Sequence, residues 1–422
     1  MNGFVNFLEK YLSGPMARLS EQRHLRAVRD GVVSSLPFII IGSLFLIIAM
    51  PPVAPDSALG MWASSNAAQI MIPFRVTMFI MTLYVTFGIG YNLAQTYKLD
   101  PLTGGQLSIA ALLMTITPQA TDAGWMLPMA NLGGQGLFVA ILVSIFAVEV
   151  QRICKEKNLT IKMPEQVPSS ISRSFAALFP VAIIIFVMGF ITVFLGIDLH
   201  AVIGRLVAPL IVAGDSLPGV LLIVFLITFF WSFGIHGVSV IGAVARPLWQ
   251  IYIEQNAAAA AAGEALPFVA PETFYQWFVW IGGAGATLGL VIAVMLVSRS
   301  KYLKTMGKVT ALPALFNINE PIMFGLPIVL NPILIIPFIT IPLVTTVISY
   351  LATLSGLVNA TFITVPWTLP APIGAFLATG GDWRAVVLVL INIAISTVIY
   401  LPFVKMYDAK LVQQEQGEEI AA

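Results

Sequence analysis

One carboxylate, Glu320, lies alone in a long uncharged stretch of this sequence. Between Lys308 and Asp382 there are 73 residues, and Glu320 is the only charged one. At the middle of a bilayer a charged side chain costs about 2.5–3.5 kcal/mol on insertion scales, and such residues usually mark a substrate or ion path. We therefore expect the ligand of this protein to meet Glu320.

Amide side chains and a proline accompany this carboxylate in the segment Phe316–Pro321. Asn317 and Asn319 add four hydrogen-bond donors and two acceptors within three residues of Glu320. Pro321 would end or redirect a helix and leave backbone groups free beside the carboxylate. This set suits a polyhydroxylated ligand, because each sugar hydroxyl both donates and accepts. The alternative is a buried carboxylate that bonds a neighbouring helix end.

A second group of polar and aromatic residues lies in the uncharged segment Trp231–Gly237. His236 has Gly237 beside it, which permits close approach of the backbone, and Trp231 lies five residues upstream. With Trp367, the indole of Trp231 could stack on the apolar faces of pyranose rings. The alternatives are a core histidine with its hydrogen bonds satisfied and tryptophans of an interfacial belt. Taken together, the aromatic, imidazole, amide and carboxylate groups point to a sugar more than to an ion or a lipid.

Two arginines fall within apparent membrane spans. Arg75 follows Ile72-Pro73-Phe74, and Arg246 precedes Pro247. Either guanidinium could pair with Glu320 or hydrogen-bond the ligand. Either could equally lie near an interface with its charge in the headgroup region.

The composition indicates a membrane protein built from helices. Hydrophobic residues make up 58% of the chain and charged residues 10%, whereas soluble domains carry about 25% charged residues. Several uncharged runs reach the roughly 20 residues that cross a hydrocarbon core. The net charge of +1 favours no particular partner, and we expect no nucleic acid. The fold class is therefore an all-α polytopic membrane protein.

Loop charges give an orientation through the positive-inside rule. Five basic residues precede the first uncharged run and place the N-terminus in the cytoplasm: Lys10, Arg18, Arg23, Arg26 and Arg29. Further basic loops, which include Lys162, alternate with loops poor in lysine and arginine, so both termini come out cytoplasmic. The pattern fits ten crossings, at about 31–50, 70–93, 104–118, 135–151, 175–197, 217–235, 238–256, 273–298, 333–353 and 384–404.

The chain divides near residue 200 into two halves. We expect a cytoplasmic segment 1–30, a scaffold half 31–198, an amphipathic interfacial helix 199–215, a transport half 216–405 and a cytoplasmic tail 406–422. Prolines concentrate in the second half, where 311–331 and 358–379 are apolar but rich in proline. Irregular backbone at membrane depth must be buried in protein or line a wet cavity, and broken helices commonly form transport sites. Both segments are therefore predicted to be re-entrant hairpins, with proline-kinked helices as the alternative.

We expect neither a metal nor a cofactor. The three histidines His24, His200 and His236 are too scattered to suggest a metal site, and Cys154 is the single cysteine. Asn131–Gly136 is rich in glycine but lacks the Lys-Ser/Thr of a P-loop, so it is interpreted as a turn before the fourth crossing.

The chain resembles the enzyme IIC permeases of the bacterial phosphoenolpyruvate-dependent sugar phosphotransferase system, in the lactose/cellobiose/diacetylchitobiose group. The resemblance covers essentially the full length. It is carried by five segments: Tyr97–Pro101, Val167–Phe175, Trp231–Gly237, Phe316–Pro321 and Gly380–Arg384.

This resemblance implies ten transmembrane helices with two re-entrant hairpins, in a homodimer formed through the N-terminal half in the bacterial cytoplasmic membrane. It implies that the C-terminal half carries a disaccharide across in an elevator-like way. The 6-hydroxyl would then be phosphorylated by a phosphocysteine on a separate enzyme IIB, which enzyme IIA supplies. By motif match Glu320 and His236 are the essential carboxylate and histidine, and Trp231, Gly237, Asn317, Asn319 and Trp367 are expected to contact the sugar.

The chain is thus expected to be the membrane subunit of a protein-phosphocysteine–sugar phosphotransferase, with no phosphoryl-carrying residue of its own, because Cys154 does not match the loop of IIB. Glu320 could accept the proton of the hydroxyl, with His236 as the alternative base. The favoured sugar is a β-glucoside such as cellobiose or diacetylchitobiose, with lactose as an alternative. The rival function is an ion-coupled secondary sugar transporter that uses Glu320 as a proton or Na⁺ site.

Overall fold

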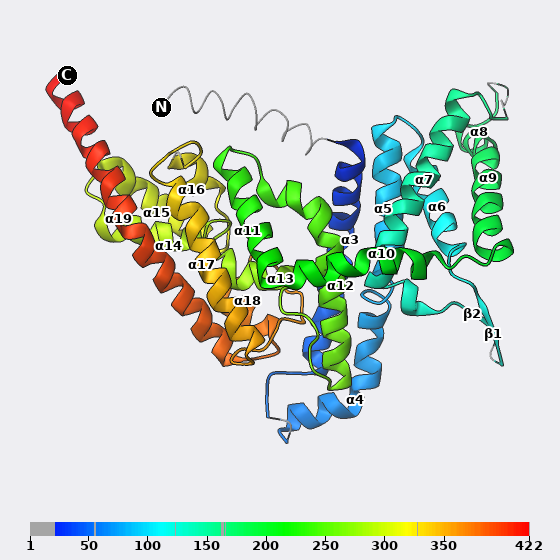
Figure 1. Cartoon of the computed structure of the whole chain (residues 1–422), viewed down its shortest axis with the longest axis horizontal. Helices are drawn as coiled ribbons and strands as arrows, with labels where there is room; N and C mark the ends of the chain where they lie inside the picture. The colour runs from blue at the N-terminus through cyan, green and yellow to red at the C-terminus, as the bar shows by residue number, and fades with distance from the viewer. Residues whose placement is uncertain are drawn as a thin grey trace.

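The computed structural model describes residues 22–54, 56–122, 124–161, 164, 166–326 and 328–421, which form a bundle of helices (Figure 1). Lys10, Arg18, Lys162 and most of the predicted segment 1–30 lie outside the described residues. The helices of the first half are α3 (Arg23–Ala49), α4 (Ala58–Arg75), α5 (Met81–Thr96), α6 (Pro101–Leu113), α7 (Leu137–Glu156), α8 (Ser169–Ala176) and α9 (Leu178–Gly189). The remaining helices are α10 (Leu199–Asp215), α11 (Leu217–Ser232), α12 (Gly237–Ala262), α13 (Glu272–Phe274), α14 (Thr287–Val297), α15 (Lys301–Leu315), α16 (Glu320–Gly325), α17 (Ile335–Leu354), α18 (Ala371–Ala378) and α19 (Trp383–Ala421).

The prediction of an all-helical membrane fold is confirmed. Among the described residues, five helices are long and apolar enough to cross a membrane, or six if α10 and α11 count as one span bent by 78°. Most of the other predicted crossings are short or interrupted, and α12, which contains the crossing 238–256, is a continuous helix of 26 residues that is not apolar enough to count. Length and composition alone therefore do not yield ten. One short antiparallel hairpin, β1 (Gln119–Thr121) with β2 (Gly124–Met126), lies between α6 and α7, where no strand is predicted.

Two predicted crossings are divided in the structure. The crossing 70–93 is wrong as one helix, because α4 ends at Arg75 and α5 begins at Met81. The crossing 273–298 is also broken, because a π-helical turn, Tyr275–Val279, is followed by Trp280 as its C-cap, and α14 begins only at Thr287. Between them Gly282, Gly283 and Gly285 have positive φ, which explains the break because that backbone conformation does not continue a helix.

The predicted tail 406–422 is helical over its described part. α19 continues past the expected end of the last crossing, and Asp408 on it accepts hydrogen bonds from the backbone N–H of Arg299 (2.9 Å) and of Ser300 (2.9 Å). These bonds cap the start of α15 and fix α19 against the loop that precedes it.

The two predicted re-entrant segments consist of short helices and extended backbone. In the first, α15 leads through a turn at 316–319 into the six-residue α16. In the second, residues 357–370 form neither helix nor strand and return along α18, where the N–H groups of Phe362 and Ile363 donate to the carbonyl of Ala378. Neither segment is a continuous helix, in line with the prediction.

Asp382 ties the ends of the second segment together. Its carboxylate accepts from the N–H of Asn359 (2.9 Å) and from the guanidinium Nε of Arg384 (2.9 Å). Burial alone would raise the pKa of Asp382, but these hydrogen bonds outweigh it and hold the pKa below its ordinary value. The charge is therefore present at neutral pH.

Side chains also satisfy irregular backbone elsewhere in the second half. Asn256 exchanges hydrogen bonds with the backbone of Phe268 and donates to the carbonyl of Thr361 (2.9 Å). Asp215, at the end of α10, accepts from the N–H groups of Val269 and Ala270. These bonds satisfy backbone groups that neither water nor lipid could satisfy in the bilayer core. They fix the loop before α13 beside the core.

Close backbone approach holds α3 against α5 in the first half, where Figure 1 shows the two helices side by side. A Cβ added at Gly31 would lie 2.5 Å from the backbone N of Ile89 and 2.8 Å from its Cα. A Cβ at Gly88 would lie 2.9 Å from the carbonyl O of Gly31. Small residues allow such contact between helices in a membrane.

We predict that Gly31→Val lowers the midpoint of thermal unfolding in detergent, because the added side chain must push α3 away from α5. Overpacking of this kind costs about 1–3 kcal/mol. The control is Gly204→Val on α10, where an added Cβ has no heavy atom within 4 Å. Equal unfolding midpoints for the two variants would contradict the packing argument.

Candidate functional site

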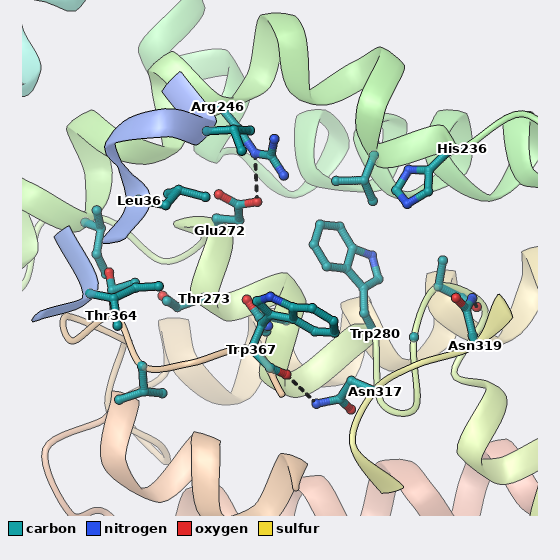
Figure 2. A pocket seen from close by; sticks show the side chains of 18 of the residues that line it. Leu36, His236, Arg246, Glu272, Thr273, Trp280, Asn317, Asn319, Thr364 and Trp367 are labelled. Atoms are coloured by element: carbon teal, nitrogen blue, oxygen red, sulfur yellow. Dashed lines mark hydrogen bonds and ion pairs between the residues drawn. The ribbon is translucent and has the colours of Figure 1, made fainter. Parts of the chain in front are cut away.

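A cavity of about 400 Å³ lies where the broken segments meet α3 and α12 (Figure 2). Its size falls in the range of about 300–1,000 Å³ that is usual for small-molecule sites. Seven of the nine residues that the sequence analysis selected line it: Trp231, His236, Arg246, Asn317, Asn319, Glu320 and Trp367. Gly237 and Arg75 are not among the lining residues.

Glu320 is the first residue of α16 and faces the cavity as an exposed side chain. The sequence analysis treated it as a charge in an apolar medium, but the break between α15 and α16 places it at an open surface. Among the described residues, no ion pair is formed with its carboxylate. Glu320 is therefore free to accept hydrogen bonds from a ligand.

His236 lies at the start of α12, after the turn that ends α11. Its Nδ1 accepts a hydrogen bond from the backbone N–H of Ser239 (3.2 Å) and lies 3.0 Å from the Ser239 hydroxyl. Because a nitrogen that accepts an N–H bond carries no proton, this contact places the single proton of the neutral imidazole on Nε2. The neutral ring therefore presents a donor, not a proton acceptor, at Nε2.

Trp231, at the end of α11, packs beside this imidazole. The ring centroids are 4.6 Å apart and the ring planes are tilted by 49°. Trp231 is buried, so in this structure it offers only part of its surface to the cavity. Gly237, the first residue of α12, is buried, and a Cβ there would lie 2.0 Å from the carbonyl O of Ile227. Its role in this structure is to let α11 and α12 approach.

Asn317 and Asn319 have their side-chain amides directed at the backbone. Asn317 bonds the backbone of Gly282, Trp367 and Leu369, and Asn319 donates to the carbonyl of Ala284 (3.2 Å). Asn319 is buried, whereas the side chain of Trp367 is 50% exposed and lies across the cavity in Figure 2. The two asparagines thus join the turn that precedes Glu320 to both neighbouring broken segments.

Arg246 pairs with Glu272 and not with Glu320. The guanidinium Nε of Arg246 lies 3.1 Å from Oε1 of Glu272, with side-chain exposures of 14% and 19%. Of the partners that the sequence analysis considered for Arg246, Glu320 is therefore excluded in this structure. Arg75 is exposed at the end of α4 and does not line the cavity.

The sequence analysis missed several lining residues. Glu272 lies just before the predicted crossing 273–298, and Thr273, Gln276 and Trp280 lie in its first part, up to the break. Figure 2 shows Trp280 between the Arg246–Glu272 pair and Asn319. A signal was present, because Glu272 follows Pro271 and Trp280 stands just before a glycine-rich run. Residues of α3 (Val33, Leu36 and Ile40) complete the wall, and nothing in their sequence marks them.

Known proteins resemble this chain over its full length. A family model described as "Phosphotransferase system, EIIC" matches residues 29–342. The chain is 39% identical to the lichenan permease IIC component of Bacillus subtilis (strain 168), over 100% of this chain and 97% of that protein. It is 37% identical to the cellobiose-specific EIIC component of Geobacillus stearothermophilus, over 99% and 97% respectively. The crystal structure of the transporter ChbC, the IIC component from the N,N'-diacetylchitobiose-specific phosphotransferase system, matches with a TM-score of 0.92 at 39% identity, over 97% of this chain and 99% of that one.

We predict that Arg246→Ala destabilises the protein by about 2 kcal/mol, because it leaves the Glu272 carboxylate unpaired in a largely buried position. The double variant Arg246→Met/Glu272→Leu should lose less stability than Arg246→Ala, since it leaves no unpaired charge. Thermal unfolding in detergent measures both, and Arg205→Ala, an exposed arginine of α10, is the control. A single variant as stable as the unmodified protein would show that the pair contributes nothing.

Proposed function

This chain belongs to the EIIC family of the sugar phosphotransferase system, and from that premise we propose that it takes up a β-linked disaccharide and presents it for phosphorylation. The sugar class follows from relatives that are named for lichenan, cellobiose and N,N'-diacetylchitobiose. The phosphoryl donor is a phosphocysteine on a separate enzyme IIB, which is charged through enzyme IIA. The chain itself is a multi-pass membrane protein.

The observation that carries this proposal is the composition of the cavity wall. An exposed carboxylate (Glu320), an imidazole whose proton is held on Nε2 (His236) and indole side chains (Trp280 and Trp367) face one space of about 400 Å³. Carboxylate and imidazole suit hydroxyl groups, and the indoles suit the apolar faces of sugar rings. An apolar pocket with a few convergent polar groups is the usual form of a small-molecule site.

The charges of the wall disfavour an anionic ligand and are compatible with a neutral one. Arg246 is neutralised by Glu272 within the wall, so neither needs a counter-charge from the ligand. Glu320 then remains as the carboxylate that faces the cavity without an ion pair among the described residues. A neutral disaccharide would meet it through a hydroxyl.

Phosphoryl transfer asks the protein mainly for positioning and for stabilisation of developing charge. In the proposed step the sugar O6 attacks phosphorus, the O–P bond forms, and the S–P bond to the cysteine of IIB breaks to release its thiolate. Glu320 accepts the O6 proton. His236 donates from Nε2 to an oxygen of the sugar, and its fixed proton makes it the weaker candidate for the base.

The rival function is a secondary transporter in which Glu320 binds a coupling ion. Membership of the EIIC family disfavours it. Proteoliposomes that contain the protein test the two directly. Our proposal predicts cellobiose uptake only with phosphorylated IIB and recovery of the 6-phosphate. Accumulation of free sugar without IIB, abolished by a protonophore, would overturn it in favour of the rival.

We further propose that both termini are cytoplasmic and that a homodimer forms through the residues before about 198, with an elevator-like movement of the second half. The orientation rests on the basic loops. The dimer and the elevator-like movement are proposed from membership of the EIIC family.

We predict that Glu320→Gln lowers the rate of sugar phosphorylation at least about 100-fold, because glutamine cannot accept the proton. Sugar affinity should fall no more than about tenfold, since the amide oxygen still accepts a hydrogen bond. The rate is measured with purified phosphorylated IIB, and the affinity by calorimetry without it.

The matched control is Glu264→Gln, an exposed carboxylate after α12 that lies outside the cavity wall. It should change neither quantity. An unchanged phosphorylation rate in Glu320→Gln would remove Glu320 from the chemistry.

A further inference from the structure

The side chain of Asn317 connects three broken segments that form the cavity. Its Oδ1 accepts from the N–H of Gly282 (2.9 Å), and its Nδ2 donates to the carbonyls of Trp367 (2.9 Å) and Leu369 (2.8 Å). The bond to Trp367 is drawn in Figure 2. We infer that Asn317 is a positioning residue, which sets Trp367 and the loop 280–286 against Glu320 and does not itself bind the sugar. This inference rests on the proposed function.

The Asn317 amide has no N–H donor left for a sugar. A side-chain amide has two N–H donors, and in Asn317 both are used by backbone carbonyls. A sugar hydroxyl could receive a hydrogen bond from this amide only if one of these bonds broke. The carbonyl so released would then be left without its partner in a proline-rich segment that has few backbone donors of its own.

The backbone of Asn317 also suits a positioning role. Its φ is +61°, in the left-handed region that asparagine and glycine adopt more readily than other residues. This conformation ends α15 and reverses the chain, so the side chain faces the loop 280–286 while Glu320 begins the next helix. Asparagine is suited to both tasks, because it tolerates the turn and carries the bridging amide.

The loop 280–286 and the turn before Glu320 are also in close contact. A Cβ added at Gly283 would lie 2.6 Å from Cβ and from Cγ of Asn319. Asn319 donates to the carbonyl of Ala284, and the hydroxyl of Tyr400 donates to the carbonyl of Gly285 (2.7 Å). The loop 280–286 is therefore pressed between the turn before Glu320 and α19. Trp367, by contrast, is joined to this loop and turn by the hydrogen bond between its carbonyl and the Asn317 amide. Its position therefore depends more heavily on that amide.

Two substitutions change the hydrogen bonds of the amide but keep the backbone conformation of the turn. Asn317→Gly and Asn317→Asp both tolerate a positive φ. Glycine removes all three hydrogen bonds, whereas aspartate keeps an acceptor for Gly282 but places carboxylate oxygen against the carbonyls of Trp367 and Leu369. Both should free the segment 366–370, and glycine should free the loop 280–286 as well.

The first test needs no sugar. Amide hydrogen exchange of the full-length protein in nanodiscs is compared for the unmodified chain, Asn317→Gly and Asn317→Asp. We expect faster exchange of the Leu369 N–H, which donates to the carbonyl of Pro366, for both variants, faster exchange in 280–286 for glycine, and no change in α5 or α7. The control is Asn66→Asp, whose amide donates to the carbonyl of Trp62 on α4, away from the cavity. Unchanged exchange in both segments, or faster exchange throughout the protein, would overturn the inference.

The second test asks whether Asn317 acts through Trp367. Cellobiose affinity is measured for Asn317→Asp, for Trp367→Ala and for the double variant. We expect Asn317→Asp to weaken binding about tenfold in the unmodified chain but less than about twofold when Trp367 is already alanine. The same loss in both backgrounds would mean that Asn317 contacts the sugar directly, and would overturn the inference.

The two tests also separate this inference from the proposed function. If the unmodified protein binds no disaccharide, the proposed substrate fails. The hydrogen-exchange result then still decides whether Asn317 holds the three segments together.

Discussion

The structure depends on one constraint: backbone groups that leave a helix at membrane depth must find hydrogen-bond partners within the protein. In the second half of this chain several helices are interrupted, and polar side chains supply the missing partners. Asn256 and Asp215 fix the loop before α13, Asn317 and Asn319 fix the turn before α16, and Asn392 donates to the carbonyl of Phe278 in the π-helical turn. These bonds hold the interrupted segments in fixed positions.

The cavity is a consequence of these interruptions. His236 follows the end of α11, Trp280 follows the π-helical turn, Glu320 begins α16 and Trp367 lies in a turn between α17 and α18. Each of these residues stands between helices and lines the cavity, although Trp280 is largely covered by Trp249 and Tyr275. Chemical groups that would be costly inside a continuous span therefore gather around one space, and Arg246 and Glu272 neutralise each other in its wall.

The sequence predicted much of this arrangement because an isolated polar group in an apolar run is easy to detect. Glu320, His236 and Asn319 stand out in this way, and all line the cavity. The break at 280–286 was missed because glycine is frequent in membrane helices, so the glycine-rich run was not taken as a break. Two contacts could not be predicted from the sequence, because their partners are distant along the chain. The partner of Arg246 comes from a segment 26 residues away, and the bonds of Asn317 depend on segments 35 to 52 residues distant.

The central claim is that Glu320 contacts the 6-hydroxyl of the bound sugar. The most direct test is a thermodynamic cycle of binding affinities, with cellobiose and its analogues deoxygenated at either C6, for the unmodified protein and Glu320→Ala. We expect that loss of one 6-hydroxyl weakens binding to the unmodified protein about tenfold, but hardly at all in Glu320→Ala. An equal loss in both proteins, for both analogues, would show that Glu320 and the 6-hydroxyl do not interact.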